Sequence, residues 1–336
     1  MTPLLQKSGE IVGDEEVCES SFQADQTWTG FAEKTWQVHK FGGTSVASAD
    51  CYRSAAKIVE DQLGIHERTT TTGDEGNASS SPKKRLNMAI VVSAMGGKPK
   101  TTDLLLQSVE AAAKRDQEEV DRLLEYVRQK HETCLEELFG ANDCEKDLME
   151  IVETDLHNIR DILKTVALMK WQAQRISELV SGYGELWSAR ILTMVLHNRS
   201  VGRQSEIGLD DEFVFVDARR IIVIDEEAIQ DGAVEWTISQ EKLSNVYQEE
   251  TAKYNSNGRL HFVITGYVAS NTEGVATTLQ RDGSDYSAAI MGRLLQATNI
   301  TIWTDVDGGE TYFCFSGSKL LYYIKILYTF LHMRSC

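Results

Sequence analysis

The chain has 336 residues, with 51 acidic and 34 basic side chains and a formal net charge of −17. This charge disfavours non-specific contact with nucleic acid, which needs clustered Lys and Arg, although backbone N–H groups and a few local cations can still bind a small anion. Hydrophobic residues make up 42% of the sequence, and the length allows one large or two small globular domains.

The two ends of the chain differ in character from the middle. Residues 1–35 are acidic and lack hydrophobic periodicity, so we expect a disordered leader with neither a secretory nor a transit signal. The apolar run over residues 320–331 is too short to cross a bilayer, and we expect a soluble protein without membrane contacts. The six cysteines include no C-x-x-C pair, which disfavours zinc and is typical of reduced thiols, and we predict no metal site.

The first predicted strand, over residues 36–40, leads into the motif KFGGTS at residues 40–45 and then into a helix over residues 48–63. Paired glycines let a backbone approach a phosphate closely, and the helix N-terminus adds N–H donors. Lys40 could neutralise charge on a phosphoryl group during transfer. The order differs from the P-loop, whose lysine follows the glycines. A simple turn after the strand is the alternative interpretation.

A low-complexity segment separates the first helix from the second strand. Residues 66–87 are polar and are interpreted as a surface loop, and residues 88–92 form the second buried strand. Residues 102–197 then follow a helical pattern, with breaks expected near residues 140–142 and 181–184.

Glu185 follows the second of these expected breaks, where we predict that a helix begins. An acid in a first helical turn usually complements the helix dipole. The functional alternative is a carboxylate that receives a substrate ammonium group.

Four further β-rich runs predict a mainly parallel sheet between helical layers. These runs are residues 213–216, 221–224, 262–265 and 300–304. Before the last run, the sequence TTLQRDGSDYSAA at residues 277–289 opens a helix. The planar guanidinium of Arg281 suits a carboxylate, and Asp285 could hold that arginine or a neighbouring lysine. Alternatively, Ser284 or Asp285 caps the helix.

The last of these strands ends in Thr304 and Asp305 and leads into an Asp-Gly turn. The carboxyl edge of a parallel sheet is where ligands bind in open α/β folds, although Asp-Gly after a strand is also a common turn.

Together and in this order, the motifs resemble aspartate kinase, and the match is close to the plant-type form that is fused to homoserine dehydrogenase. The motifs are KFGGTSVAS, VVSAM, SGYGELWSA, ITGYVAS, TTLQRDGSDYSAAIMG and TIWTDVDG. The resemblance covers about residues 36–308 and implies an incomplete catalytic domain. It implies the amino-acid-kinase (carbamate-kinase-like) fold, an eight-stranded, mostly parallel sheet in a three-layer α/β/α sandwich.

The resemblance also implies an activity and its ligands. The expected reaction transfers the γ-phosphate of ATP, carried with Mg2+, to the β-carboxylate of L-aspartate and gives 4-phospho-L-aspartate. This is the first step towards lysine, threonine, methionine and isoleucine. The resemblance allows a homodimer, and it implies a plastid location, with the cytoplasm as the alternative because no transit signal is visible.

Residue roles follow from the same resemblance. Lys40 would stabilise the transferring phosphoryl group and Asp285 would orient the Lys40 region. Glu185 would receive the α-ammonium of aspartate and Arg281 its α-carboxylate. The expected ATP and phosphate contacts are Lys40, Gly42, Gly43, Thr304 and Asp305. The expected substrate contacts are Thr44, Ser45, Ser93, Thr102, Glu185, Arg281 and Ser284.

The family pattern stops after Gly308, where no Asp-Pro-Arg segment follows. We therefore expect residues 309–336 to be a non-family tail, such as a retained intron, and the nucleotide lobe to be incomplete. The alternative function is a non-catalytic fragment that binds aspartate but does not bind ATP productively. A third is a kinase for another amino acid, such as acetylglutamate.

Overall fold

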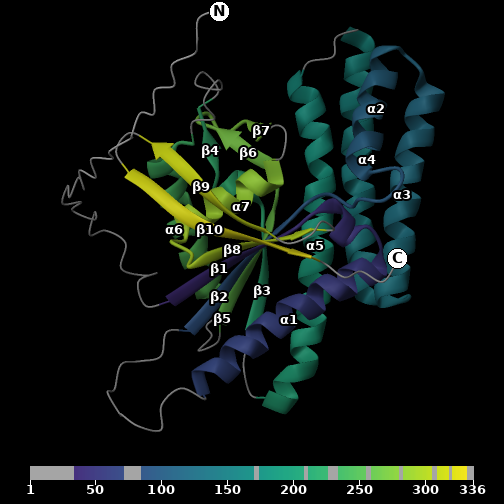
Figure 1. The fold of residues 1–336 in the computed structure, drawn as a ribbon. Helices are drawn as coiled ribbons and strands as arrows, with labels where there is room; N and C mark the ends of the chain where they lie inside the picture. Colours follow the sequence, from purple (N-terminus) through teal and green to yellow (C-terminus); the bar gives the residue numbers. More distant parts are fainter. Residues whose placement is uncertain are drawn as a thin grey trace, which may run out of the picture.

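The structure, a computed structural model, is an α/β sandwich with a central, mostly parallel sheet (Figure 1). The residues that it describes are 34–71, 85–169, 174–207, 211–225, 234–254, 259–279, 283–304, 309–317 and 320–330. The expected leader over residues 1–35 lies outside these ranges except for its last two residues.

The main sheet has seven strands in the order β3-β5-β2-β1-β8-β10-β9, one strand fewer than expected among the described residues. Five of them form a parallel core: β1 (Lys34–Phe41), β2 (Arg85–Val92), β3 (Asp211–Val216), β5 (Arg259–Thr265) and β8 (Asn299–Thr304). Because β1 lies between β2 and β8, the residues that follow β1 emerge at the middle of the carboxyl edge.

The chain after residue 308, expected to be a non-family tail, extends this sheet with two strands that the sequence did not predict. The first is β9 (Gly309–Gly317) and the second is β10 (Leu320–Phe330). β10 pairs in parallel with β8, and β9 pairs antiparallel with β10. The hairpin therefore lies on the β8 side of the sheet (Figure 1).

A second, smaller sheet has the order β4-β6-β7, in which β6 and β7 are antiparallel. Its strands are β4 (Val223–Ile224), β6 (Val268–Asn271) and β7 (Ala276–Thr278). β6 follows β5 after a short turn at Gly266 and Tyr267, so this sheet continues from the carboxyl edge of the main sheet.

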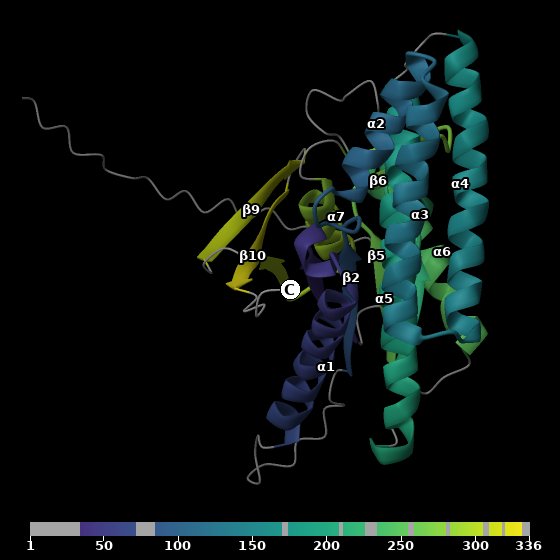
Figure 2. The same cartoon turned by 90° about the vertical axis from the view of Figure 1, so that its right-hand side faces the viewer.

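Helices cover both faces of the main sheet, as Figures 1 and 2 show. One layer holds α1 (Ala49–Thr71), α2 (Thr101–Ala113), α3 (Gln117–Phe139), α4 (Asp143–Met169) and α5 (Gln174–Ile207). The other holds α6 (Trp236–Tyr254) and α7 (Gly283–Leu294). Single turns of 3-10 helix occur at Gly43–Val46 and Ala218–Arg220.

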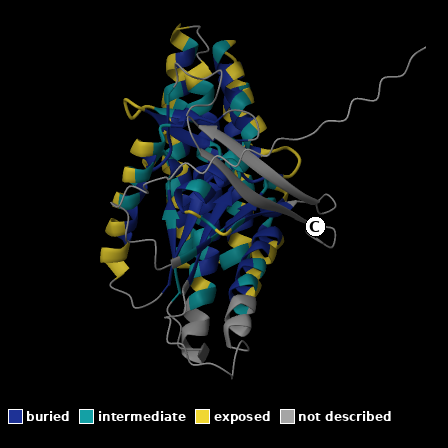
Figure 3. Cartoon of the chain, turned by 60° about the vertical axis from the view of Figure 1, so that its left-hand side comes forward, coloured by how far each residue is buried: buried dark blue, intermediate teal, exposed yellow. Residues whose placement is uncertain are grey.

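Two hydrophobic cores explain the three layers. In β2, Met88, Ile90 and Val92 pack in the core beneath α1–α5, whereas Ala89 and Val91 pack in the core beneath α6 and α7. Successive side chains of a strand point to opposite faces, so a run of apolar residues buries both sides. Figure 3 shows the buried sheet between helices whose outer faces are exposed. The predicted three-layer sandwich is confirmed.

The helical region differs from the prediction in one important place. The expected break near residues 140–142 is correct, because α3 ends at Phe139 and α4 begins at Asp143. The expected break at residues 181–184 is wrong, because α5 is continuous there. The expected loop over 66–87 is too long, since α1 extends to residue 71 and β2 begins at residue 85.

The glycines of α5 serve helix packing and not a turn. A Cβ atom on Gly182 would lie 2.7 Å from Val268 Cγ1, and one on Gly184 would lie 2.9 Å from Ala94 Cβ. Both distances are shorter than real Cβ contacts allow, so these positions let α5 approach β6 and the segment after β2. Glu185 therefore lies inside a helix, and its predicted position at a helix start is wrong.

Candidate active site

The site begins at the carboxyl end of β1, where Lys40 is buried. Its Nζ lies 2.6 Å from Oδ1 of Asp285, which belongs to the first turn of α7. A carboxylate at this position also complements the positive end of the α7 dipole. The ion pair therefore fixes the Lys40 ammonium between the central strand and the start of α7.

The glycine motif after β1 packs directly against the segment after β2. Gly96 N donates to Gly43 O at 2.9 Å, and a Cβ atom on Gly96 would lie only 2.3 Å from that oxygen. A Cβ atom on Gly42 would lie 3.5 Å from Lys40 Nζ, so the Gly42 backbone faces the ammonium closely. Ser45 N donates to Gly42 O at 2.9 Å, which closes the turn.

The carboxyl end of β2 contacts the start of α7 through two serines. The Ser93 hydroxyl donates to the Ser284 hydroxyl at 2.9 Å. Gly266 supports this contact, because its N–H donates to Val92 O at 2.8 Å and a Cβ atom there would lie 2.6 Å from Ser284 Cβ. The start of α7 is therefore held against both β1 and β2.

Glu185 is buried, and no described Lys, Arg or His forms an ion pair with it. Ala94 N–H donates to it, and no described residue donates a hydrogen bond to its Oε2. Burial raises the pKa of Glu185 to about 8, and the backbone hydrogen bond offsets only part of this shift. A buried carboxyl with an unpartnered oxygen is suited to receive a positively charged ligand group.

A cleft of about 940 Å³ joins Glu185 to the start of α7. Thr102 and Lys100 line it from the start of α2, and Tyr267 lines it from the turn after β5. Its described lining residues are Lys100, Thr102, Asp103, Leu106, Gln174, Ser177, Glu178, Glu185, Tyr267, Thr278, Gly283 and Ser284. Since Ser284 is followed by Asp285, the cleft lies beside the Lys40 ion pair.

The structure brings most of the predicted site residues to one edge of the sheet. Lys40, Gly42, Gly43, Ser93, Ser284 and Asp285 are linked by the contacts above, and Glu185, Thr102 and Ser284 share the cleft. Thr44 is exposed, and Ser45 is buried with no hydrogen-bond partner for its hydroxyl among the described residues. Arg281 and Asp305 lie outside the described residues. For Thr304 only its backbone, at the end of β8, is described.

Sequence reasoning missed Tyr267, although the motif ITGYVAS contains it. Tyr267 has a left-handed backbone with φ 66°, and its N–H donates to the Ser287 hydroxyl at 3.0 Å. A side chain rarely adopts this conformation, so the α7 contact holds the residue in place at the cleft. The Gly-Tyr pair directly after a buried strand was the available signal.

Within the described ranges, no group of three or more His, Cys, Asp or Glu side chains is placed to hold a metal ion. None of the described helices is long and apolar enough to span a membrane.

Comparison with known proteins gives a consistent set of similarities. The model of the amino acid kinase family matches residues 35–308. The bifunctional aspartokinase/homoserine dehydrogenase 2, chloroplastic, of Arabidopsis thaliana is 29% identical over 273 residues, covering 81% of this chain and 25% of the relative. The Zea mays protein of the same name is 31% identical with the same coverage. The chain thus spans about a quarter of the length of these relatives.

A solved structure shares the fold. The crystal structure of E. coli aspartokinase III in complex with aspartate and ADP superposes with a TM-score of 0.60 at 24% identity, covering 82% of this chain and 50% of that one. At this identity the likeness shows the fold alone.

Proposed function

Because the chain belongs to the amino acid kinase family, we propose that it is an aspartate kinase, which transfers the γ-phosphate of ATP to the β-carboxylate of L-aspartate. The names of its relatives support this choice, since those that match over 81% of this chain are aspartokinases fused to homoserine dehydrogenases. The proposal covers the kinase reaction only, because the chain spans about a quarter of those relatives.

One observation carries the proposal: a buried carboxyl, Glu185, and a buried ammonium, Lys40, both lie next to the start of α7. Glu185 and Ser284 line the same cleft, and Asp285, which follows Ser284, forms the ion pair with Lys40. A substrate with a cationic amine and an anionic carboxylate could place its amine at Glu185 and its carboxylate at Lys40. Aspartate has both groups, and its β-carboxylate would then face Lys40.

In the proposed reaction, an oxygen of the aspartate β-carboxylate attacks the γ-phosphorus of ATP. The new C–O–P bond forms as the bond between that phosphorus and the β,γ-bridging oxygen breaks, and ADP leaves with the electron pair. Lys40 stabilises the negative charge of the transferring group. The substrate carboxylate is the nucleophile, so the protein supplies position and charge and no covalent intermediate is needed.

The nucleotide phosphates would contact the backbone at Gly42 and Gly43. The fit rests on the absence of side chains there and on the short distance to Lys40, since a Cβ atom on Gly42 would be 3.5 Å from its Nζ. Thr304 and Asp305 are proposed to contact the nucleotide from the end of β8. Mg2+ would arrive bound to ATP and neutralise phosphate charge.

The remaining predicted residues are proposed to bind aspartate. Glu185 would give up its proton and pair with the α-ammonium, and Arg281 would bind the α-carboxylate with its planar fork. Smaller hydroxyl contacts would come from Thr44, Ser45, Ser93, Thr102 and Ser284. Residues 36–308 are the proposed catalytic region. The chloroplastic names of the relatives support a plastid location for this chain as well.

A hydroxylamine trap tests the proposal, because acyl phosphates react with it to give hydroxamates. We expect purified, folded protein to form a hydroxamate that depends on both ATP and L-aspartate. N-acetylglutamate and glutamate in parallel reactions test the substrate choice. A product with N-acetylglutamate alone would identify a different amino acid kinase, and no product with any acceptor would favour a fragment without productive ATP binding.

A further inference from the structure

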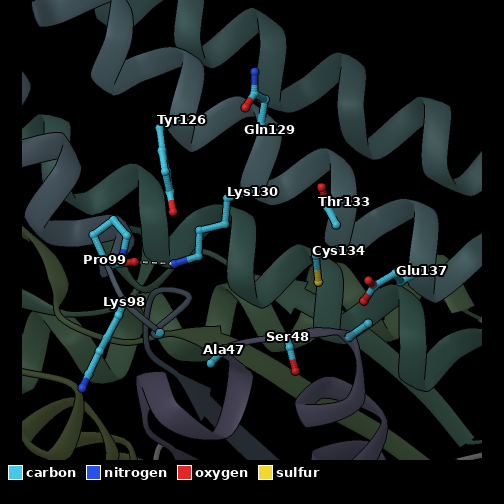
Figure 4. A pocket seen from close by; sticks show the side chains of 12 residues that line it. Ala47, Ser48, Lys98, Pro99, Tyr126, Gln129, Lys130, Thr133, Cys134 and Glu137 are labelled. Carbon is cyan, nitrogen blue, oxygen red and sulfur yellow. Dashed lines mark hydrogen bonds between the residues drawn. The ribbon is translucent and has the colours of Figure 1, made fainter. Parts of the chain in front are cut away.

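Lys130 lies outside every sequence motif but makes an unusual pair of contacts. It belongs to α3, and its ammonium donates to the backbone carbonyls of Gly96 and Pro99, the latter at 2.8 Å. Both carbonyls belong to the segment between β2 and α2, residues 93–100, which we call the 93–100 loop. Figure 4 shows Lys130 reaching toward Pro99, whereas Lys98 points away. One side chain thus fastens α3 to this loop at two points.

The ammonium bonds to two carbonyl dipoles, and the charge of Asp103 acts to raise its pKa without a salt bridge. Lys130 is half-buried at the wall of a second cleft of about 460 Å³, and burial lowers its pKa. It forms no ion pair with any described residue. A half-buried lysine loses part of its hydration, and an apolar side chain there would avoid that cost. The two loop carbonyls are therefore the specific partners of this ammonium.

The 93–100 loop contacts the proposed machinery on its other side. Gly96 N donates to Gly43 O at 2.9 Å, and the two backbones pack with no room for a Cβ atom. Ala94 N–H donates to the carboxylate of Glu185. A shift of the loop would therefore move the backbone beside Lys40 or remove the hydrogen bond to Glu185.

From these contacts we propose that Lys130 is a positioning residue for phosphoryl transfer. Lys130 binds the 93–100 loop from α3, and the loop in turn sets the position of the Gly43 backbone through Gly96. The inference rests on the proposed function for its kinetic part, but the order of the loop can be measured without activity. Since a displacement of about 1 Å can cost up to a hundredfold in rate, we expect Lys130→Met to lower kcat about tenfold or more.

The experiment compares Lys130→Met and Lys130→Arg with the matched control Gln129→Met. Gln129 lines the same cleft but bonds to Glu125 and not to the loop. Hydrogen exchange of a peptide spanning residues 93–101 reports the loop directly, including the Gly96 amide. Thermal unfolding shows which variants fold. If Lys130→Met does not fold, the loop exchange and kcat of Lys130→Arg serve as the test, because its guanidinium can donate to both carbonyls.

We expect faster exchange in the loop and lower kcat for Lys130→Met, partial recovery of both in Lys130→Arg, and unchanged values in Gln129→Met. Parent-like loop exchange in folded Lys130→Met would overturn the inference, as would parent-like kcat. If the parent forms no hydroxamate, the proposed function fails, while the exchange measurement still decides whether Lys130 orders the loop.

Discussion

Lys40 Nζ and Asp285 Oδ1 lie 2.6 Å apart and join the end of β1 to the first turn of α7. The two partners differ in exposure: the Lys40 side chain is 11% exposed and that of Asp285 is 34%. The ammonium is therefore embedded while the carboxylate reaches the surface of the site. An anion that approaches Lys40 would meet a cation already oriented by Asp285.

The first prediction concerns Asp285→Asn. The amide keeps the size of the side chain but removes the charge that orients Lys40, so we expect kcat to fall roughly a hundredfold. A partly exposed ion pair contributes little to stability, so the melting temperature should change by only a few degrees. Asp50→Asn is the control, because Asp50 pairs with Arg53 on the exposed face of α1. Retention of most activity in Asp285→Asn would contradict the proposed role.

A second prediction follows from the pKa of about 8 at Glu185. Only the deprotonated form can pair with an ammonium, and it makes up about a tenth of the molecules at pH 7. The KM for aspartate should therefore fall about tenfold from pH 6 to pH 7 and level off above pH 8. Steady-state kinetics at several pH values measures this, with the KM for ATP as the internal control. A KM for aspartate that is constant from pH 6 to pH 8 would exclude the role.

The same shift makes a prediction about stability that is independent of activity. Burial raises the pKa of Glu185 from 4.5 to about 8. The contribution of the protonated side chain to the free energy of unfolding is therefore fully present below pH 4.5 and is lost as the pH rises through 8. Glutamine keeps the shape and does not titrate. From pH 5 to pH 8.5, the free energy of unfolding of Glu185→Gln should rise relative to the parent by about 3–4 kcal/mol. Urea denaturation at pH 5 and pH 8.5 measures the stability of both proteins. A difference in stability between Glu185→Gln and the parent that is the same at both pH values would refute the prediction.

Two buried histidines predict a loss of stability in acid. His39 accepts a hydrogen bond from Trp303 Nε1 at 3.2 Å, and burial lowers the pKa of His39 and of His131 to about 4. The unfolded chain takes up these protons near pH 6.5, so their stabilising effect is present above 6.5 and is lost as the pH falls through 4. Both groups together should contribute up to about 2.7 kcal/mol per pH unit to the slope, and the opposite contribution of Glu185 reduces the net slope of the parent.

Denaturant unfolding at pH 7, 6 and 5 measures that slope. His131→Asn should make it shallower, because the amide can keep the bond to the Val127 carbonyl without titrating. His157→Gln removes an exposed histidine and should leave the slope unchanged. The same pH dependence in the parent and in His131→Asn would show that His131 is not buried in its neutral form, because the opposing contribution of Glu185 cancels in this comparison.

Motifs next to strand ends could be read from the sequence, because a parallel sheet brings the carboxyl ends of its strands to one edge. The strands before Lys40 and Ser93 were predicted from their apolar runs, and the helix that carries Asp285 was predicted from its Ala-rich sequence after a Gly-Ser turn. The ion pair itself required the structure. So did the α7 contact with Ser93, because serine pairs leave no distinctive pattern in a sequence.

Packing contacts could not be read in the same way. Gly182 and Gly184 are typical of a turn, but α5 continues through them, and close neighbours there leave no room for Cβ atoms. Lys130 was missed because its partners are backbone carbonyls more than thirty positions earlier, and carbonyls carry no sequence signal. The strands after residue 308 were missed because the segment was judged only by its lack of family pattern.

The most direct test of the whole account compares the parent with Lys40→Met in the hydroxylamine trap, with Lys57→Met as the control on the exposed face of α1. All three proteins are first shown to be folded by thermal unfolding. We predict ATP-dependent aspartyl hydroxamate from the parent and from Lys57→Met, and a loss of at least a thousandfold in Lys40→Met. Equal product from the parent and Lys40→Met would contradict the central role of the β1 lysine.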